Sequence, residues 1–260
     1  MKVIDLTDEY KQLYFVCLED WSEEMKEAGS HKETWYNEMK ENDLKVKLAI
    51  DENEQVGGMI EYMPIEYAFA QGSDHYFINC IWVHRYKKGR GNFQKRGMGK
   101  ALLKAAEEDV KALGTKGMVA WGISLPFWMK ASWFKKHGYK KVDSNKGIVL
   151  LWKPFSSDAV PPKWIKKKYT PELTPGKVTV TSFYNGQCPA YNIVHERAKL
   201  AAKEFGDKII FHTINTNDKE IMHRYGEKDS LYIDAKKATK GPPLSYKKIK
   251  RRMAKRVKKL

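Results

Sequence analysis

The spacing of apolar residues divides the first 155 residues into helices and strands. Residues 8–41 are rich in helix formers and charged side chains, which predicts that helices precede the first good pair of strands. Apolar runs then predict strands over 44–50, 56–62 and 76–83. The third of these has the composition of a central, buried strand, with Phe77, Ile78, Cys80, Ile81, Trp82 and Val83.

A helix and further strands follow this central strand. Five apolar residues recur at helical spacing before Gly114 ends the helix, namely Leu102, Leu103, Ala106, Val110 and Leu113. The pattern next predicts a strand over 118–123, a helix over 127–137 ended by Gly138, and a closing strand region over 139–152. This order of elements predicts an α/β fold with a central sheet flanked by helices.

A change of composition after residue 153 predicts a boundary. Five prolines and three consecutive lysines lie between residues 154 and 176, so we expect a first domain over 1–155 and a linker over 156–176. The remainder, 177–260, has strands over 178–184, 209–214 and 230–233, which alternate with helices over 193–205 and 219–225. The β-α-β-α-β order suits a small thioredoxin-like α/β domain.

The end of the chain predicts an amphipathic, basic helix. Its apolar residues recur every three or four positions, and nine lysines and arginines fill 247–259. The formal charge of +16 is concentrated here, because 1–155 contribute +2 and 156–260 contribute +14. Such a segment attracts polyanions, including nucleic acid, although a solvated lysine-rich surface is the commoner explanation, and both interpretations stay open.

Other compositional features favour a soluble protein of the cytoplasm. No stretch approaches eighteen consecutive apolar residues, and the first residues lack the pattern of a secretory signal, so no membrane association is expected. Cys17, Cys80 and Cys188 lie far apart in the sequence, without the paired spacing of a zinc site or a redox CxxC. We therefore predict no metal and a reducing compartment.

One loop carries the strongest chemical signal. It has the sequence Gln94-Lys95-Arg96-Gly97-Met98-Gly99, is followed by Lys100, and lies between the central strand and the amphipathic helix. Glycines let backbone N–H groups approach an anion, and the start of a helix adds a positive dipole suited to a pyrophosphate. A P-loop or a dinucleotide fingerprint would need other residues here, whereas an ordinary basic turn stays an alternative.

These residues resemble the GNAT superfamily of N-acetyltransferases. Gln94, Gly97 and Gly99 match its acyl-CoA pyrophosphate signature, and Cys80-Ile81-Trp82-Val83 is similar to the preceding central strand. The segment Trp133-Phe134-Lys135-Lys136-His137-Gly138-Tyr139 resembles a later helix-to-strand element of the superfamily. The resemblance implies a mixed sheet, acetyl-CoA as co-substrate, and cofactor contacts from Ile81, Trp82, Val83 and residues 94–100.

Two departures from that superfamily affect the mechanism. The loop over 84–93 is longer than usual and adds Gly89 and Gly91, so an alternative phosphate register stays open. The tyrosine that many such enzymes use to reprotonate the CoA thiolate aligns with Phe134, which has no hydroxyl.

A further resemblance extends over nearly the whole chain. Three segments resemble those of GNAT proteins that carry a C-terminal YoaP-like domain. They are Gly58-Met59-Ile60-Glu61-Tyr62-Met63-Pro64, the strand Asn79-Cys80-Ile81-Trp82-Val83, and Gly186-Gln187-Cys188-Pro189. That resemblance implies a thioredoxin-like second domain.

Candidate catalytic residues follow from the chemistry of acetyl transfer to an amine, which needs a base to remove a proton from the nucleophile. Glu61 is the first candidate, because it lies in a mostly apolar strand where burial can raise a carboxyl pKa; a structural role at the sheet surface is the alternative. Glu66 and His75 are weaker candidates.

Aromatic residues and one cysteine complete the list of candidates. An acceptor pocket could use Trp82, Trp121, Phe127, Trp128 and Trp133, although aromatics in such positions more often belong to the core. Cys188 precedes a helix whose dipole would lower its thiol pKa, but Tyr191 stands where a redox pair would need its second cysteine. Monothiol chemistry and a structural role both stay open for Cys188.

The sequence thus predicts an acetyl-CoA-dependent N-acetyltransferase that acts by direct attack of an amine in a ternary complex. The alternative is an acyl-CoA-sensing binding module whose basic C-terminal domain recruits a polyanion or a protein. The sequence identifies neither the acceptor amine nor the oligomeric state.

Overall fold

A computed structural model describes residues 1–125, 128–239 and 242–260 of the chain. Its residue contacts form two compact units. The first comprises Met1–Trp21 and Asn37–Ile165, and the second comprises Ser22–Tyr36 and Lys166–Leu260. This division differs from the predicted ranges because residues 22–36 group with the C-terminal unit and 156–165 with the N-terminal one.

The first unit is built on a seven-stranded sheet of order β1-β2-β3-β5-β6-β8-β7. Its strands are β1 (Lys2–Asp5), β2 (Lys45–Ile50), β3 (Val56–Pro64), β5 (His75–Val83), β6 (Gly117–Ile123), β7 (Lys140–Asn145) and β8 (Ile148–Pro154). Neighbouring strands are antiparallel except β5 and β6, which are parallel, so the sheet is mixed. The long helix between β5 and β6 makes this parallel connection, as parallel pairing requires.

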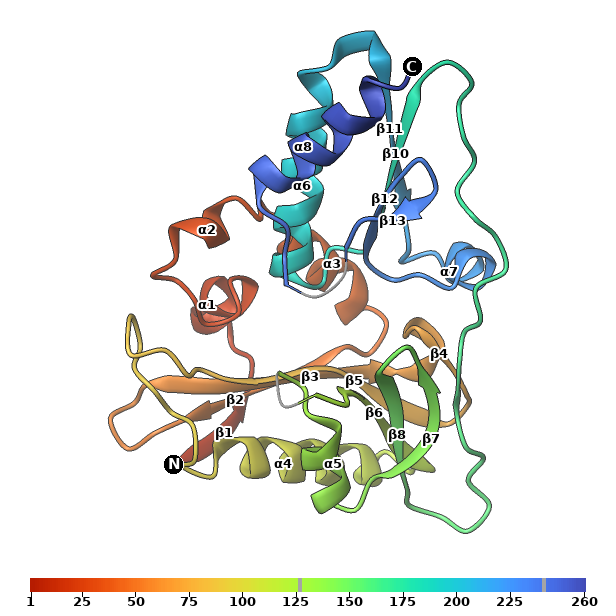
Figure 1. The fold of residues 1–260 in the computed structure, drawn as a ribbon. Helices are drawn as coiled ribbons and strands as arrows, with labels where there is room; N and C mark the ends of the chain where they lie inside the picture. The colour runs from red at the N-terminus through yellow and green to blue at the C-terminus, as the bar shows by residue number, and fades with distance from the viewer. Residues whose placement is uncertain (126–127, 240–241) are drawn as a thin grey trace. The chain divides into compact units, whose positions relative to one another are not determined.

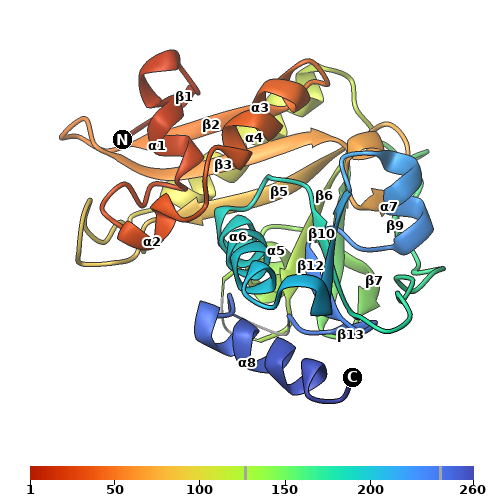
Figure 2. The same cartoon turned by 90° about the horizontal axis from the view of Figure 1, so that it is seen from above.

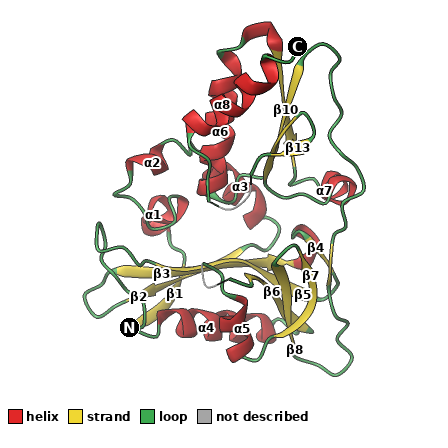
Figure 3. Cartoon of the chain, viewed as in Figure 1, coloured by secondary structure: helices red, strands yellow, loops and turns green. Residues whose placement is uncertain are grey.

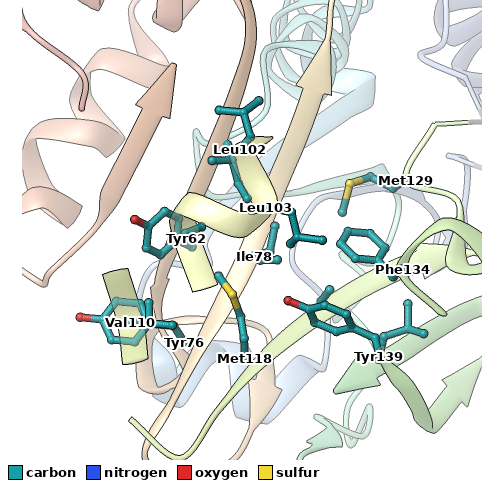
Figure 4. Close-up of a cluster of buried hydrophobic side chains, with 14 of the residues drawn as sticks. Tyr62, Tyr76, Ile78, Leu102, Leu103, Val110, Met118, Met129, Phe134 and Tyr139 are labelled. Carbon is teal, nitrogen blue, oxygen red and sulfur yellow. The ribbon is translucent and has the colours of Figure 1, made fainter. Parts of the chain in front are cut away.

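Helices cover both faces of this sheet. On one face lie α4 (Met98–Ala112) and α5 (Ala131–Lys136), and on the other lies α1 (Lys11–Phe15), as Figure 1 shows. Apolar residues of α4 pack onto β3, β5 and β6 and form the core in Figure 4, where Leu102 is fully buried beside Ile78 and Tyr62. Short 3₁₀ segments, η1 (Asp8–Tyr10) and η2 (Ile65–Tyr67), complete the unit.

Part of the predicted linker is folded onto the first unit. Lys163–Trp164 forms the short strand β9, which pairs with β4 (Ala70–Gln71). The Trp164 ring stacks on Phe69 at 5.3 Å and belongs to a second apolar cluster with Phe77 and Leu150. This burial explains why 156–165 belong to the N-terminal unit.

The second unit contains a four-stranded sheet of order β11-β10-β12-β13. Its strands are β10 (Val178–Tyr184), β11 (Ile209–Asn215), β12 (Ser230–Ile233) and β13 (Lys236–Lys237). The β10–β11 pair is parallel, and the other two pairs are antiparallel. The remaining elements are α2 (Glu23–Lys26), α6 (Pro189–Lys203), η3 (Gly206–Lys208), α7 (Lys219–Tyr225) and α8 (Tyr246–Val257), while α3 (His31–Lys40) begins in this unit.

The helices of the second unit are divided between the faces of its sheet. Within this unit α6 and α8 lie on one side of the strands and α7 on the other (Figure 2). Alternate residues of β10 follow the same division, since Val178 and Val180 join the core with α6 and α8, whereas Phe183 contacts Tyr225 of α7.

The predicted α/β fold with an additional smaller domain is confirmed (Figure 3). Three local predictions differ from the structure. A strand, β1, precedes the predicted helices; the closing strand region is a hairpin of two strands; and the predicted helix over 127–137 begins only at Ala131. Within the described ranges, no helix has both the length and the apolar composition that crossing a bilayer requires.

Candidate functional site

The central sheet of the first unit opens between its two parallel strands. The last pair of β5 with β6 is Ile78 with Ala120, although β5 continues to Val83 and β6 to Ile123. At the same point the pairing of β5 with β3 shifts by one residue and leaves Asn79 as a bulge. Bulges bend a strand and often lie beside active sites. We call the opening after Ile78 and Ala120 the fork.

Side chains at the fork fix its geometry. The Trp121 indole of β6 donates a hydrogen bond to the Asn79 carbonyl at 2.9 Å, and the Asn79 amide donates to the Met63 sulfur. Beyond Asn79, the edge of β5 that faces β6 has no sheet partner in the described structure over Ile81, Trp82 and Val83. These three residues are half-buried. The fork therefore presents backbone N–H and C=O groups to an extended ligand.

The glycine-bearing loop lies at the end of β5 and opens α4. Gly97 has φ +85° and precedes the helix, and a Cβ added there would meet no atom within 4 Å. A glycine offers no side-chain oxygen to the first-turn N–H groups of Met98, Gly99 and Lys100, so these donors are available to an anion. A Cβ on Gly99 would contact Val83 and Trp133, which places the helix start beside the fork.

The loop also carries exposed positive charge. Lys95, Arg96 and Lys100 are exposed at the helix start. The Arg96 guanidinium lies 3.8 Å from the Asp51 carboxylate and over the Phe93 ring, so its position is partly fixed. Backbone donors, the helix dipole and these cations all favour a phosphate group at this place.

Close packing of α4 on β3 holds the helix start in position. Met98 is buried, and a Cβ on Gly57 would lie 2.8 Å from its sulfur and 2.4 Å from the Phe93 ring. A Cβ on Gly58 would lie 3.0 Å from Leu102. The two β3 glycines thus let the helix and its loop approach the sheet.

The additional loop over 84–93 is attached to the rest of the unit. The buried His84 ring accepts a hydrogen bond from the Trp21 indole at 3.0 Å, so its other nitrogen donates to the Gly91 carbonyl at 2.6 Å. A Cβ on Gly89 would lie 1.9 Å from the Trp21 ring. Gly89 therefore has a packing role, and no local sequence pattern indicates its contact with Trp21.

Glu61 lies in β3 opposite Cys80 of β5, one residue before the bulge. It is fully buried, and its carboxylate accepts a hydrogen bond from the Tyr14 hydroxyl at 2.6 Å. Burial and the neighbouring carboxylate raise the pKa of Tyr14 well above its usual range, so this hydroxyl stays protonated. No sequence pattern indicates Tyr14, in α1, as part of the site, because its partner is 47 residues away.

The two weaker candidate bases lie at the other end of these strands. Glu66 is exposed in η2, after the end of β3. His75, at the start of β5, is buried and bonded to the Val160 carbonyl at 2.8 Å. Neither lies at the fork, and His75 has a structural contact instead.

The predicted aromatic pocket is divided among separate contacts. Trp121 packs on Trp128 at 5.1 Å, Trp133 packs on His137 at 4.2 Å, and Trp82 contacts Tyr86. Phe127 lies outside the described residues. Phe134 is fully buried in the core between Trp133 and Tyr139, where its ring packs and donates no proton (Figure 4).

Cys188 lies in the second unit, immediately before α6. Burial and the nearby Asp229 carboxylate raise the pKa of its thiol, which is opposite to the lowering expected from the helix dipole. Among the described residues, no group of three or more His, Cys, Asp or Glu side chains is placed to hold a metal ion.

Comparison with known proteins identifies the family of this chain. A model described as the acetyltransferase (GNAT) family matches residues 4–139, just over half of the chain. No curated protein matches the chain in sequence.

Several solved acetyltransferase structures each match about three-fifths of the chain. The PaiA N-acetyltransferase of Thermoplasma acidophilum, solved with coenzyme A, is 19% identical, and the match covers 60% of this chain and 100% of that one with a TM-score of 0.44. The ribosomal-protein-alanine N-acetyltransferase of Brucella melitensis is 13% identical, with coverages of 60% and 100% and a TM-score of 0.44. A GNAT acetyltransferase of Brucella melitensis, solved with acetyl-CoA, is 13% identical, with coverages of 63% and 94% and a TM-score of 0.40.

Proposed function

Because the chain belongs to the acetyltransferase (GNAT) family, we propose that it transfers the acetyl group of acetyl-CoA to an amine of a small molecule or protein. The observation that carries this proposal is the fork beside a glycine-started helix. The open edge of β5 and the first turn of α4 lie next to each other, since Gly99 adjoins Val83. An extended chain that ends in phosphates fits this pair of features.

In the proposed complex, the backbone of residues 94–100 binds the pyrophosphate, with charge from Lys95, Arg96 and Lys100. Ile81, Trp82 and Val83 pair with β3 on one side, and their open edge on the β6 side binds the extended arm of the cofactor and aligns the thioester at the fork. The support for this assignment is the open space beside Gly97 and the absence of a sheet partner for this part of β5 in the described structure.

The reaction proceeds by direct attack of the amine in a ternary complex. The amine nitrogen forms a bond to the thioester carbonyl carbon, the carbon–sulfur bond breaks, and the thiolate leaves. A proton goes from the amine to a base, and another reaches the thiolate. We assign the role of base to Glu61, which Tyr14 positions. Water donates the proton that the thiolate receives, since Phe134 has no hydroxyl.

Steady-state kinetics test the proposal. Thiol release from acetyl-CoA should depend on an added amine from a panel of small amines and peptides. Glu61→Gln should lower kcat/KM by roughly 10²–10⁴-fold, while the affinity for CoA stays unchanged. Tyr14→Phe should have a smaller effect.

Glu66→Gln is the matched control, because this carboxylate is exposed and lies away from the fork. If CoA binds but no amine stimulates turnover, the protein is an acyl-CoA-sensing binding module and the proposed enzyme activity is wrong. If Glu61→Gln keeps full activity, another group is the base.

We further propose that the second unit is a thioredoxin-like accessory domain similar to YoaP-like domains. Its support is the strand order β11-β10-β12-β13, with one parallel pair and helices on both faces. The raised thiol pKa of Cys188 favours a structural role for this residue over monothiol chemistry.

A further inference from the structure

The second unit carries a positively charged hollow between β13 and α8. The buried side chains of Ile233 and Ala238 line it, together with five cations: Lys236, Lys237, Arg252, Lys255 and Arg256. Among the residues that the structure describes, no acidic side chain lines it. Its volume is about 230 Å³, well above the roughly 10–15 Å³ that one water molecule needs.

A tight turn and the helix together produce this arrangement. Asp234 and Ala235 both have left-handed φ angles, 47° and 56°, and form the two-residue turn that presents Lys236 and Lys237. On the opposite side, Ile249 and Met253 of α8 are fully buried, which directs the basic residues of the helix away from the core.

Carboxylates neutralise only part of this charge. Asp234 lies 3.5 Å from the Arg256 guanidinium, and Glu227 lies 2.7 Å from the Lys237 ammonium. Lys236, Arg252 and Lys255 have no carboxylate partner among the described residues. Three cations around one hollow therefore repel each other unless an anion lies between them.

The charge continues along α8. Its exposed basic residues recur every three or four positions, so cations follow one another at about the 5.4 Å pitch of the helix. They are Lys247, Lys248, Arg251, Arg252 and Lys255, and the exposed Lys258 and Lys259 follow the end of the helix. Because no acidic residue interrupts 247–259, the surface suits a ligand with a row of negative charges.

A membrane surface fits this helix less well than a free polyanion. Basic amphipathic helices bind membranes by inserting their apolar face. In α8 that face is occupied, because Ile249 and Met253 pack against the core of the second unit. The guanidinium groups of Arg252 and Arg256, which line the hollow, also favour phosphate oxygens.

We infer that the hollow and the adjoining face of α8 bind the phosphate backbone of a nucleic acid without recognising its sequence. The hollow holds one phosphate between β13 and α8, and neighbouring phosphates contact the exposed cations of the helix. This site is independent of the acetyl-transfer function.

The test uses the full-length protein and a fluorescein-labelled 20-nucleotide oligouridine, with fluorescence anisotropy at several salt concentrations. The double variant Lys236→Gln/Lys255→Gln should bind about tenfold more weakly. Since each phosphate contact contributes about 0.7 to the slope of log affinity against log salt for a single strand, the slope should fall by about 1.4.

Lys177→Gln/Lys208→Gln is the matched control, because it removes the same charge from exposed residues of the same unit outside the hollow. It should keep the affinity within about twofold. An equal loss in both variants, or in neither, would overturn the proposal, as would binding to phosphatidylserine vesicles without binding to the oligonucleotide. Both variants replace exposed side chains, and equal melting curves would show that they fold.

Discussion

Gly97 has a left-handed backbone conformation and open space beside it. Substitutions there can therefore distinguish the effect of a side chain's size from the effect of its charge on CoA binding. Asparagine and aspartate both tolerate the left-handed region and have nearly the same shape. Gly97→Asp places a negative charge at the helix start, where the pyrophosphate is proposed to bind. We expect it to weaken CoA binding at least tenfold more than Gly97→Asn, as measured by calorimetry. Equal CoA affinities in the two folded variants would show that the pyrophosphate does not bind at this loop.

His195 makes the second unit sensitive to acid. It is buried, with Nδ1 2.8 Å from the Ser182 hydroxyl and its ring stacked on Tyr184. Burial lowers the pKa of His195 from 6.5 to about 4, against the opposing effect of Glu196. The unfolded chain therefore binds a proton at a higher pH than the folded chain, and the free energy of unfolding falls as the pH drops from about 6.5 to about 4.

The full shift corresponds to a loss of about 3 kcal/mol across that range. His195→Gln should remove this part of the pH dependence, which urea unfolding at pH 7, 5.5 and 4 would measure. His212→Gln, which changes an exposed imidazole, should retain it. Parallel curves for the wild type and His195→Gln would show that the pKa of this histidine does not change on folding.

Single residues also mark the limit of prediction from sequence. The loop glycines were identifiable because their neighbours form a local pattern between a strand and a helix. The pairs Tyr14–Glu61 and Trp21–His84 were not, since their members are 47 and 63 residues apart and only the folded sheet brings them together. The lowered thiol pKa predicted for Cys188 was wrong for a related reason. Its position before a helix is visible in sequence, whereas its half-buried surroundings and the nearby Asp229 carboxylate are not.

At the level of elements, Arg197 of α6 attaches α2 to the second unit. Its guanidinium donates to Glu27 at 2.7 Å and to Glu24 at 2.8 Å, and its side chain is largely buried. Arg197→Gln should destabilise the attached segment by about 1 kcal/mol, because the glutamates are half exposed. Hydrogen exchange should then be faster in residues 22–30.

Lys199→Gln is the control on the same helix, since its exposed side chain has no ion pair with α2 among the described contacts. Unchanged exchange in Arg197→Gln would mean that apolar contacts alone hold the segment.

The elements that the sequence predicted well are long and strongly periodic, such as α4 and β5. The missed ones are short. β1 has four residues and β13 has two, too few for alternation to be visible. The β7–β8 turn uses Lys146 and Gly147 with φ of 46° and 88°, and a lysine there lacks the Asn-Gly signal that identifies such hairpins.

At the scale of the whole molecule, composition predicted where the basic residues are concentrated, but it did not predict which segments belong to each unit. The predicted boundary followed the prolines, which mark where the chain changes direction, whereas burial of Trp164 keeps 156–165 with the first unit. Residues 22–36 join the second unit through contacts with α6, and neither hydropathy nor charge in that segment indicates so distant a partner.

This alternating membership sets an order of assembly during synthesis. Glu27 leaves the ribosome 170 residues before Arg197, its partner in the second unit. At a synthesis rate of roughly 5–20 residues per second, residues 22–36 remain without this partner for about 10–30 s, while the ribosome is still synthesising the strands of the first unit. The second unit therefore closes only after its last helices appear, and until then residues 22–36 are exposed to chaperones and proteases of the cell.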